Sequence, residues 1–317
     1  NMPTDTNHKA TALEINDAHC HFFSEGFFAK LWSELSTGQK HQPEGNTPQS
    51  LLEQLGWDAP GSINELADRW VAELDYVGVN RVALMSSVAE DELSVAKAIE
   101  RHPKRFVGMF MVNPLAPDGA ERVQRAFGEY HLRCACLFPA MHHYSLNDES
   151  VKDIFKLAAQ YNCAVFVHCG ILSIGVRKKL GLRSVFDIQR GNPLALVPIA
   201  SQFPTVPIIV PHFGAGFFKE LLMASDLCQN IYTDTSSSNS WTKYMANFSL
   251  VDVFHYALNV LGPERILFGT DSSFFPRGWQ QPLFDVQQTV FDTLDLIPEK
   301  RNAILSENFN RVFGVDN

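Results

Sequence analysis

The chain has 317 residues, of which 45% are hydrophobic and 19% charged, a composition typical of globular proteins with a large core. Its formal net charge is −9 and it holds no run rich in Lys and Arg, so we expect neither a nucleic-acid partner nor a membrane surface. No apolar stretch reaches the roughly 18 residues that a membrane span needs.

The first twelve residues, NMPTDTNHKATA, are polar and lack the apolar region of a signal peptide. We expect a disordered tail over residues 1–12, followed by a single domain over 13–317. The cysteines lie mostly in apolar runs, where free thiols pack as small hydrophobic side chains. Together these features predict a reduced, cytoplasmic protein.

Eight apolar runs of strand length follow one another along the chain. They are often β-branched and nearly continuous in apolar character, which is typical of parallel strands buried on both faces. They cover residues 13–19, 79–86, 105–113, 133–138, 164–169, 206–212, 231–236 and 265–271.

Helix-like segments separate these runs. Apolar residues recur at spacings of three and four before Gly78, and Asn192 followed by a proline is typical of a helix start. The segments are 63–78, 92–103, 148–162, 192–204, 215–228, 249–261 and 282–293. Strands that each precede a helix predict an α/β fold, a (β/α)8 TIM barrel. An open doubly wound sheet is the alternative, but no glycine-rich phosphate loop follows the first strand.

The segment from Phe22 to Gly61 is too long for an ordinary connection. It is rich in aromatic residues, among them Trp32, and contains several glycines. We expect an inserted flap over residues 22–61 that is ordered, partly helical and covers the barrel mouth. Its aromatic side chains favour a substrate with an apolar or aromatic body, although packing within the flap explains them equally well.

Polar residues fall at the C-terminal ends of several strands, where barrels of this kind carry their active sites. They are His19 and His21 (first strand), Asn113 (third), His168 (fifth), His212 (sixth) and Asp271 (eighth). Side chains at positions i and i+2 of a strand share a face, so both histidines of the first strand point into the mouth. Buried imidazoles and a carboxylate at one rim are costly without a compensating ion. The pattern therefore predicts a metal site.

The motifs DAHCHFF, VFVHCG, VPHFGAG, LFGTDSSF and ILSENFNRVFG resemble those of the amidohydrolase-related (amidohydrolase 2) family of the amidohydrolase superfamily, in its aminocarboxymuconate-semialdehyde decarboxylase-like branch. The likeness runs from about Asn16 to Gly314. It implies that His19, His21, His168 and Asp271 hold the metal and that His212 polarises the substrate or transfers protons. It also suggests a homodimer.

The chain departs from the better-known two-metal amidohydrolases, whose fourth strand supplies a bridging carbamylated lysine. The fourth strand here is RCACLFPA, and no lysine occurs between Lys104 and Lys152. We therefore predict one divalent ion, zinc in the first place and manganese as the alternative.

Such a site supports two reactions. In the first, one bound ion lowers the pKa of a water from 15.7 towards about 7. His212 then orients or deprotonates that water, and Asp271 carries a proton to the leaving group. This predicts a metal-dependent hydrolase of a small carbonyl, amide or lactone substrate. The alternative is a non-oxidative decarboxylase of an aromatic or enolic carboxylic acid, in which either residue protonates carbon. A non-catalytic metal-binding module is a third hypothesis.

Both reactions call for a small, carboxylate-bearing substrate, and arginine suits bidentate carboxylate capture. Arg277 lies closest in sequence to Asp271, and Arg177 follows the fifth strand together with Arg183 and Arg190. The substrate-binding hypotheses are Arg277, Arg177, Trp32 and Asn113; for each arginine a solvated surface position is the alternative. We expect His142 and His143, which follow the fourth strand in a loop, at the surface; entry into the pocket is the alternative.

Overall fold

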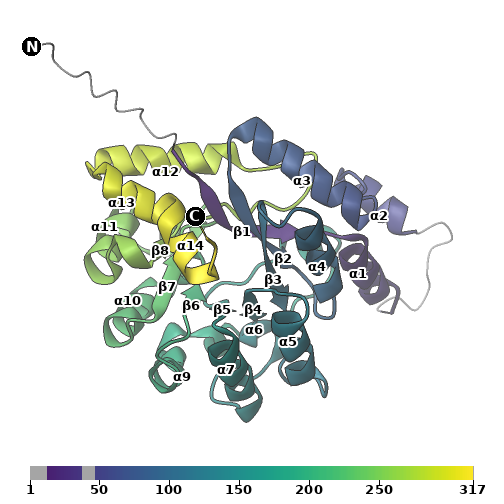
Figure 1. Ribbon diagram of the computed structural model, residues 1–317, viewed down its shortest axis with the longest axis horizontal. Coiled ribbons are helices and arrows are strands. Elements are labelled where there is room, and N and C mark those ends of the chain that lie inside the picture. Colours follow the sequence, from purple (N-terminus) through teal and green to yellow (C-terminus); the bar gives the residue numbers. More distant parts are fainter. Residues whose placement is uncertain (1–12, 38–46, 317) are drawn as a thin grey trace, which may run out of the picture.

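The computed structural model describes residues 13–37 and 47–316, so the tail expected over residues 1–12 lies outside the described residues. Each predicted strand is present, and each pairs in parallel with the next along the chain in one eight-stranded sheet. Figure 1 shows these strands surrounded by helices. They are β1 (Asn16–Phe22), β2 (Arg81–Ser86), β3 (Phe106–Met111), β4 (Cys134–Leu137), β5 (Ala164–Val167), β6 (Ile208–Val210), β7 (Ile231–Asp234) and β8 (Ile266–Leu267).

Backbone hydrogen bonds between β1 and the segment around β8 join the two ends of the sheet. The amide of Ala18 donates to the carbonyl oxygen of Phe268 at 2.8 Å, and the amide of Asp271 donates to that of His19 at 2.9 Å. The sheet is therefore a nearly closed barrel, as predicted, and the open doubly wound alternative is wrong. The second bond also places the residue at the end of the eighth predicted strand beside the first histidine of β1.

The helical periodicity in the sequence matches most of the helices outside the barrel to within a few residues. Gly78 ends the third helix in the left-handed conformation, with φ of 75°. The helices are α1 (Glu25–Thr37), α2 (Pro48–Leu55), α3 (Ile63–Val77), α4 (Glu92–Arg101), α5 (Gly119–Gly128), α6 (Pro139–His142), α7 (Glu149–Tyr161), α8 (Gly175–Lys179), α9 (Val197–Gln202), α10 (Phe218–Leu227), α11 (Leu250–Leu261), α12 (Gln281–Thr293), α13 (Pro298–Asn302) and α14 (Asn308–Phe313). In the described part of the chain, none of them has the length and apolar character to cross a membrane.

Strand residues alternate between two cores, which explains why the strands are apolar throughout. In β3, Met109 belongs to the cluster inside the barrel, whereas Phe110 packs in the cluster between the strands and the helices. Cys134 and Cys136 share the interior cluster, as their spacing predicts. All six cysteines are free and buried.

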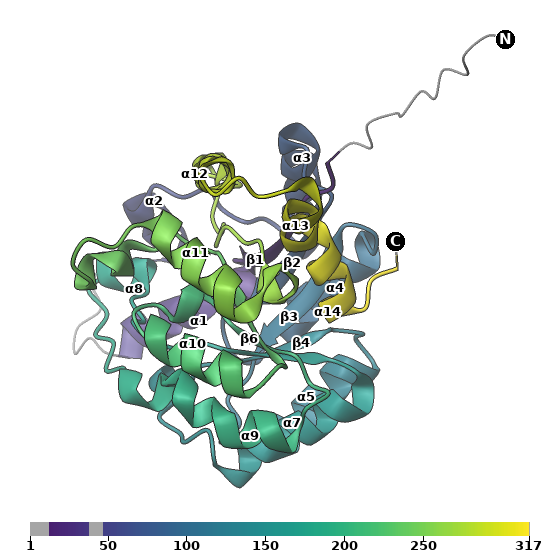
Figure 2. The same cartoon turned by 90° about the vertical axis from the view of Figure 1, so that its left-hand side faces the viewer.

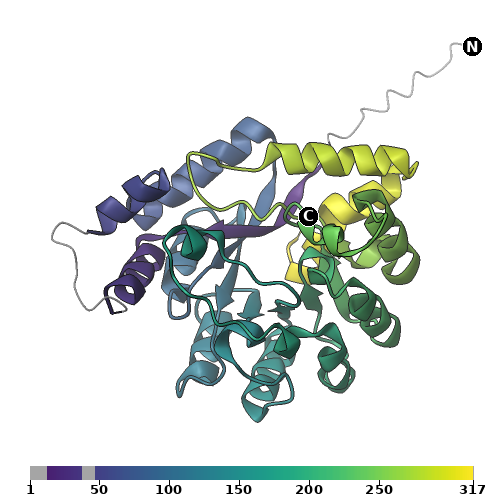
Figure 3. The same cartoon turned by 180° about the vertical axis from the view of Figure 1, so that it is seen from behind.

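The insertion after β1 is partly helical, as expected. Its described residues form α1 and α2, which pack against α8 from the loop after β5; Phe28, Leu52 and Val176 are buried where these helices meet. Arg177 of α8 also forms an ion pair with Glu34 of α1. Figures 2 and 3 show the short teal helix α8 beside the purple α1. Two segments far apart in sequence thus cover one region of the barrel together.

Candidate metal centre

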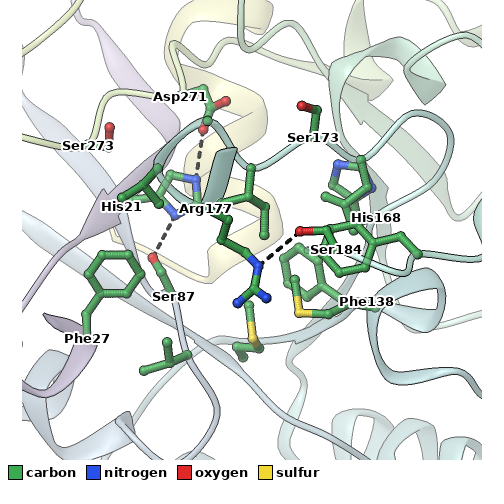
Figure 4. Close-up of a pocket in the computed structure, with 18 of the residues that line it drawn as sticks. His21, Phe27, Ser87, Phe138, His168, Ser173, Arg177, Ser184, Asp271 and Ser273 are labelled. Carbon is green, nitrogen blue, oxygen red and sulfur yellow. Dashed lines mark hydrogen bonds and ion pairs between the residues drawn. The ribbon is translucent and has the colours of Figure 1, made fainter. Parts of the chain in front are cut away.

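The strands end at a cavity of about 1300 Å³. All the polar residues that the sequence places at strand ends line it: His19, His21, Asn113, His168, His212 and Asp271. Figure 4 shows His21 beside Asp271 on one side of the cavity and His168 on the other. The barrel has therefore brought side chains from five strand ends to one space, as the sequence predicts.

His19, His212 and Asp271 form the tightest group. One potential ligand atom of each lies within 4.8 Å of the other two, so the three could hold a metal ion. Nε2 of His19 lies 3.3 Å from Oδ1 of Asp271. The group includes His212, which the sequence analysis assigned to proton transfer, while His21 and His168 lie outside it.

Hydrogen bonds at Nδ1 fix the orientation of His19 and His212. Nδ1 of His19 lies 2.8 Å from Oδ2 of Asp234, and Nδ1 of His212 lies 3.2 Å from the carbonyl oxygen of Ser236. Because these oxygens only accept hydrogen bonds, both Nδ1 atoms carry the proton. Each Nε2 is then the nitrogen left to serve as a metal ligand or a general base, once it carries no proton.

His21 is oriented in the same way. Its Nδ1 lies 2.7 Å from the hydroxyl of Ser87, and that hydroxyl donates to the carbonyl oxygen of Met85 at 3.2 Å. The serine oxygen therefore accepts from Nδ1, and Nε2 faces Oδ1 of Asp271 at 2.8 Å. Two imidazoles of β1 thus direct Nε2 at the same carboxylate oxygen.

His168 is buried and carries an unsatisfied nitrogen. Its ring stacks on Phe138 at a centroid distance of 5.6 Å and meets the ring of His212 at 5.4 Å. Among the described residues its Nδ1 has no hydrogen-bond partner. Burial, with the nearby imidazoles, lowers the pKa of His168 to about 3, so the ring is neutral. Imidazoles and a carboxylate at one cavity form a donor set that fits a divalent ion.

Two neighbouring carboxylates affect the pKa of His19 more strongly than its burial does. Burial by itself lowers the pKa of a histidine, but Asp234 and Asp271 raise the pKa of His19 to about 9. Burial likewise raises the pKa of Asp271, yet His19 and the hydrogen bond from His21 hold it well below its ordinary value. The centre therefore keeps an anionic oxygen available to a cation.

Two of the side chains come from strained backbone. His212 has φ of 56° and Asp271 has φ of 64°, in the left-handed region that costs most residues about 1–2 kcal/mol. The amide of His212 is held by Oδ1 of Asp234 at 3.0 Å, and that of Asp271 by the carbonyl oxygen of His19 at 2.9 Å. Strain supported in this way favours a functional role for both residues.

Gly170 lets the loops after β5 and β6 meet. It has φ of 79°, and a Cβ there would lie 2.1 Å from the carbonyl oxygen of Gly214. The next amide, that of Ile171, donates to the carbonyl oxygen of Ala215 at 2.8 Å. This close approach requires glycine and helps to bring His168 next to His212.

Sequence reasoning missed two buried carboxylates that support the centre. Asp234, at the end of β7, bonds to His19. Asp17, in β1, accepts from the amide of His19 at 2.9 Å, the amide of Thr270 at 3.1 Å and the indole N–H of Trp279 at 2.7 Å. The signal for Asp234 was present, because it too is a polar residue at a strand end.

We expect Asp234→Asn to weaken metal binding about 10–100-fold. Oδ1 of Asp234 accepts from the amides of His212 and Ser236, both at 3.0 Å, so the asparagine oxygen keeps that place. Its NH2 group then faces Nδ1 of His19, which must move its proton to Nε2 and lose the free lone pair. Zinc titration of the metal-free protein, followed by calorimetry, measures the change.

Asp226→Asn is the matched control, because Asp226 is exposed on α10 and its loss removes the same charge. It should leave the zinc affinity unchanged. Equal zinc affinities of the two variants would show that Asp234 does not orient the histidine.

The residues predicted to bind substrate differ in how far their side chains are already bonded to other groups of the protein. Arg277 lines the cavity, lies 4.4 Å above the ring of Phe274 and donates to Ser273 at 3.0 Å, with no ion pair to a described carboxylate. Arg177 lines it too, but its guanidinium already pairs with Glu34. The side-chain oxygen of Asn113 accepts from the amide of Leu115 at 3.0 Å. Arg277 is therefore the freest of these three.

Trp32 does not line the cavity, which corrects the expectation for the flap. Phe27, Leu31 and Glu34 of α1 do line it, at the spacing of one helix face, and Trp32 lies off that face. Phe23 and Trp57 supply cavity rings that the sequence did not single out.

His142 also corrects an expectation. It lines the cavity instead of the outer surface, and its Nδ1 has no partner among the described residues. Burial, with His143 and Lys30 nearby, lowers its pKa to about 4. His143, by contrast, is exposed, as expected.

A family model described as amidohydrolase matches residues 17–315, nearly the whole chain. The chain belongs to the amidohydrolase family. In this member of the family, the His/His/Asp group is a candidate metal site. Among curated proteins, this amidohydrolase is 22% identical over 218 residues to protein fluG of Emericella nidulans. That match covers 64% of this chain but only 24% of fluG.

Solved structures share the fold of this amidohydrolase. The 5-carboxyvanillate decarboxylase LigW from Sphingomonas paucimobilis has a TM-score of 0.69 at 16% identity, covering 96% of this chain and 100% of that one. A second 5-carboxyvanillate decarboxylase, from Novosphingobium aromaticivorans, has a TM-score of 0.64 at 16% identity, and the match covers 96% of each chain. Its structure contains manganese and 4-hydroxy-3-methoxy-5-nitrobenzoic acid. A probable 2-pyrone-4,6-dicarboxylic acid hydrolase from Acinetobacter baumannii, with citric acid bound, has a TM-score of 0.59 at 14% identity. The match covers 95% of this chain and 99% of that one.

Proposed function

We propose that this amidohydrolase is a mononuclear metal-dependent hydrolase of a small, carboxylate-bearing carbonyl, amide or lactone substrate. The observation that carries the proposal is the group of His19, His212 and Asp271, whose potential ligand atoms lie within 4.8 Å of one another at a large cavity. Both imidazoles of this group are held at Nδ1, which leaves Nε2 free.

One divalent ion, zinc in the first place, would be held by His19, His21, His168 and Asp271, the set that the family resemblance implies. When bound, such an ion lowers the pKa of a water towards about 7 and polarises a carbonyl group. The manganese in the Novosphingobium aromaticivorans structure makes that metal the alternative.

The remaining chemistry falls to His212 and Asp271. With its Nδ1 proton held by Ser236, His212 can accept a proton from the attacking water at Nε2, or polarise the substrate carbonyl once protonated there. Asp271 is an anion because its pKa is held low, so a carboxylate oxygen is open to the proton of the water, which it would return to the leaving group.

A substrate screen of the protein loaded with zinc or with manganese tests the reaction. Lactones and amides that carry a carboxylate are compared with aromatic carboxylic acids, and both acid release and CO2 are measured. Hydrolysis without CO2 supports the proposal. Release of CO2 with no hydrolysis of any lactone or amide would sink it.

A non-oxidative decarboxylase is the second candidate, and the aromatic lining of the cavity favours it. Phe23 stacks on Phe27 at 4.0 Å, and Trp57 stacks on Phe274 at 4.2 Å. Flat rings suit an aromatic acid, and two of the structures that share this fold are 5-carboxyvanillate decarboxylases. In this reaction His212 or Asp271 would protonate the ring carbon as CO2 leaves.

Either reaction would use Arg277 to hold a substrate carboxylate. We expect Arg277→Gln to raise KM for a carboxylate-bearing substrate by about 10–100-fold, because a charge-assisted hydrogen bond contributes about 1.5–3 kcal/mol. The methyl ester of the same substrate should be unaffected. Steady-state kinetics with the acid and its ester measure the difference.

Arg190→Gln serves as the control, because Arg190 pairs with Asp187 at 3.1 Å and does not line the cavity. Its KM should equal that of the unmodified enzyme. Parallel losses for acid and ester in Arg277→Gln would mean that the arginine shapes the cavity and does not bind the carboxylate.

A further inference from the structure

Trp57 links the inserted flap to the loop that carries Arg277. Its indole stacks on the ring of Phe274, with a centroid distance of 4.2 Å and an angle of 7° between the ring planes. The guanidinium carbon of Arg277 lies 4.4 Å above the same ring. Two groups this close to one ring centre cannot share a face, so Trp57 and Arg277 lie on opposite faces of Phe274. All three residues line the cavity.

The backbone around Trp57 fixes its place. Gly56 ends α2 with φ of 68°, and the amide of Trp57 then donates to the carbonyl oxygen of Leu52 at 3.1 Å. The next amide, that of Asp58, donates to the carbonyl oxygen of Phe275 at 2.9 Å. A main-chain hydrogen bond therefore lies beside the stacked rings and attaches the end of the flap to the loop after β8.

The position of Arg277 depends on the ring beneath it. Arg277 is exposed, forms no ion pair with a described carboxylate, and donates one hydrogen bond to the hydroxyl of Ser273 at 3.0 Å. An arginine that must give up many rotamers in order to bind a ligand binds it more weakly. The cation–π contact with Phe274 restricts the guanidinium before the ligand arrives. Phe274 itself is held by Trp57, because a ring with an empty space on one face can tilt into that space.

We propose that Trp57 is a positioning residue for Arg277: through the ring of Phe274 it holds the guanidinium where a substrate carboxylate binds. The inference rests on the proposed function and deepens it, because it gives the flap a part in substrate recognition. Trp57 acts through the arginine and is not a catalytic residue. Its loss therefore weakens the binding of a carboxylate more than the binding of the corresponding ester.

The test uses isophthalate and terephthalate as probes of the zinc-loaded enzyme, each compared by calorimetry with its monomethyl ester. Diacid and ester share one carboxylate, and only the diacid has a second one for Arg277. The ratio of the Kd of the ester to the Kd of the diacid is the acid preference. For at least one pair we expect an acid preference of about 10–100-fold in the unmodified enzyme, and its loss in Arg277→Gln.

Trp57→Leu removes the stacking partner of Phe274. We expect it to lower the acid preference about fivefold, the factor that a cation–π contact of an exposed arginine contributes, and to leave the affinity for the monoester unchanged. Phe274→Leu removes the ring itself and should cause the same loss. Trp57→Phe supplies a new ring and should restore the preference. Trp32→Leu is the matched control, because Trp32 belongs to the same flap and does not line the cavity.

A double variant separates positioning from direct contact with the probe. In the Arg277→Gln protein, Trp57→Leu should have no further effect on the acid preference, because two substitutions that act on one interaction are not additive. Equal losses of diacid and ester affinity in Trp57→Leu would mean that the indole contacts the probe itself, and they overturn the inference. An unchanged acid preference in Phe274→Leu overturns it too, whether or not Trp57→Leu folds.

Failure of the proposed function gives a different result. If the unmodified enzyme has no acid preference, or if Arg277→Gln keeps that preference, then Arg277 does not bind the carboxylate, and the proposed function loses this support together with the inference. An acid preference that depends on Arg277 but not on Trp57 overturns the inference alone.

Discussion

Asp271→Asn lowers kcat by a factor of about 10²–10⁴, the usual contribution of a positioned acid or base. The asparagine keeps the shape of the side chain and tolerates the left-handed backbone at this position, where φ is 64°. It loses the anionic oxygen that lies 2.8 Å from Nε2 of His21 and 3.3 Å from Nε2 of His19. Initial rates at saturating substrate, with metal content measured on the same samples, give the effect on turnover per bound ion.

Asp295→Asn is a matched control, because Asp295 is exposed and also has a positive φ, of 49°. Its activity should equal that of the unmodified enzyme. Full turnover in Asp271→Asn would refute the proton-transfer role assigned to this carboxylate.

His19→Ala removes the metal. We expect about one divalent ion per chain in the purified protein and a zinc affinity at least about 100-fold lower in the variant, because loss of a ligand exceeds the 10–100-fold effect of its outer partners. The substitution also leaves the buried carboxylate of Asp234 without the imidazole that lies 2.8 Å away. Elemental analysis of the purified proteins, with zinc titration after chelator treatment, measures both quantities.

His255→Ala is the control for this experiment, since His255 is exposed on α11 and contacts Asn259 at 3.2 Å. It should retain the full metal content. A His19→Ala protein that keeps one ion at unchanged affinity would remove the basis of the proposed chemistry.

Local patterns along the chain were sufficient to predict the strands and the histidines at their ends. A strand buried on both faces is apolar throughout, so the polar residue that ends it is visible in the sequence, as His168 and His212 show. The same signal was present at Asp234, which lies in the run predicted over 231–236, but the sequence analysis gave this residue no role. Its role became visible only from the 2.8 Å contact with His19, a residue 215 positions away.

The lining of the cavity was harder to predict, because it depends on how helices and loops dock. The sequence shows that the insertion is aromatic, but the docking of α1 decides that Phe27 faces the cavity and Trp32 does not. Arg177 looked like a free cation until the fold placed Glu34 against it.

The sequence by itself determined the barrel and the residues that meet at its mouth, because strand burial and the position of strand ends are properties of neighbouring residues. The tertiary structure decided which nitrogen of each histidine is free and which charges are already paired. Those outcomes depend on contacts between residues far apart in the chain, such as His19 with Asp234 and Arg177 with Glu34. The periodicity of a single segment carries no information about such contacts.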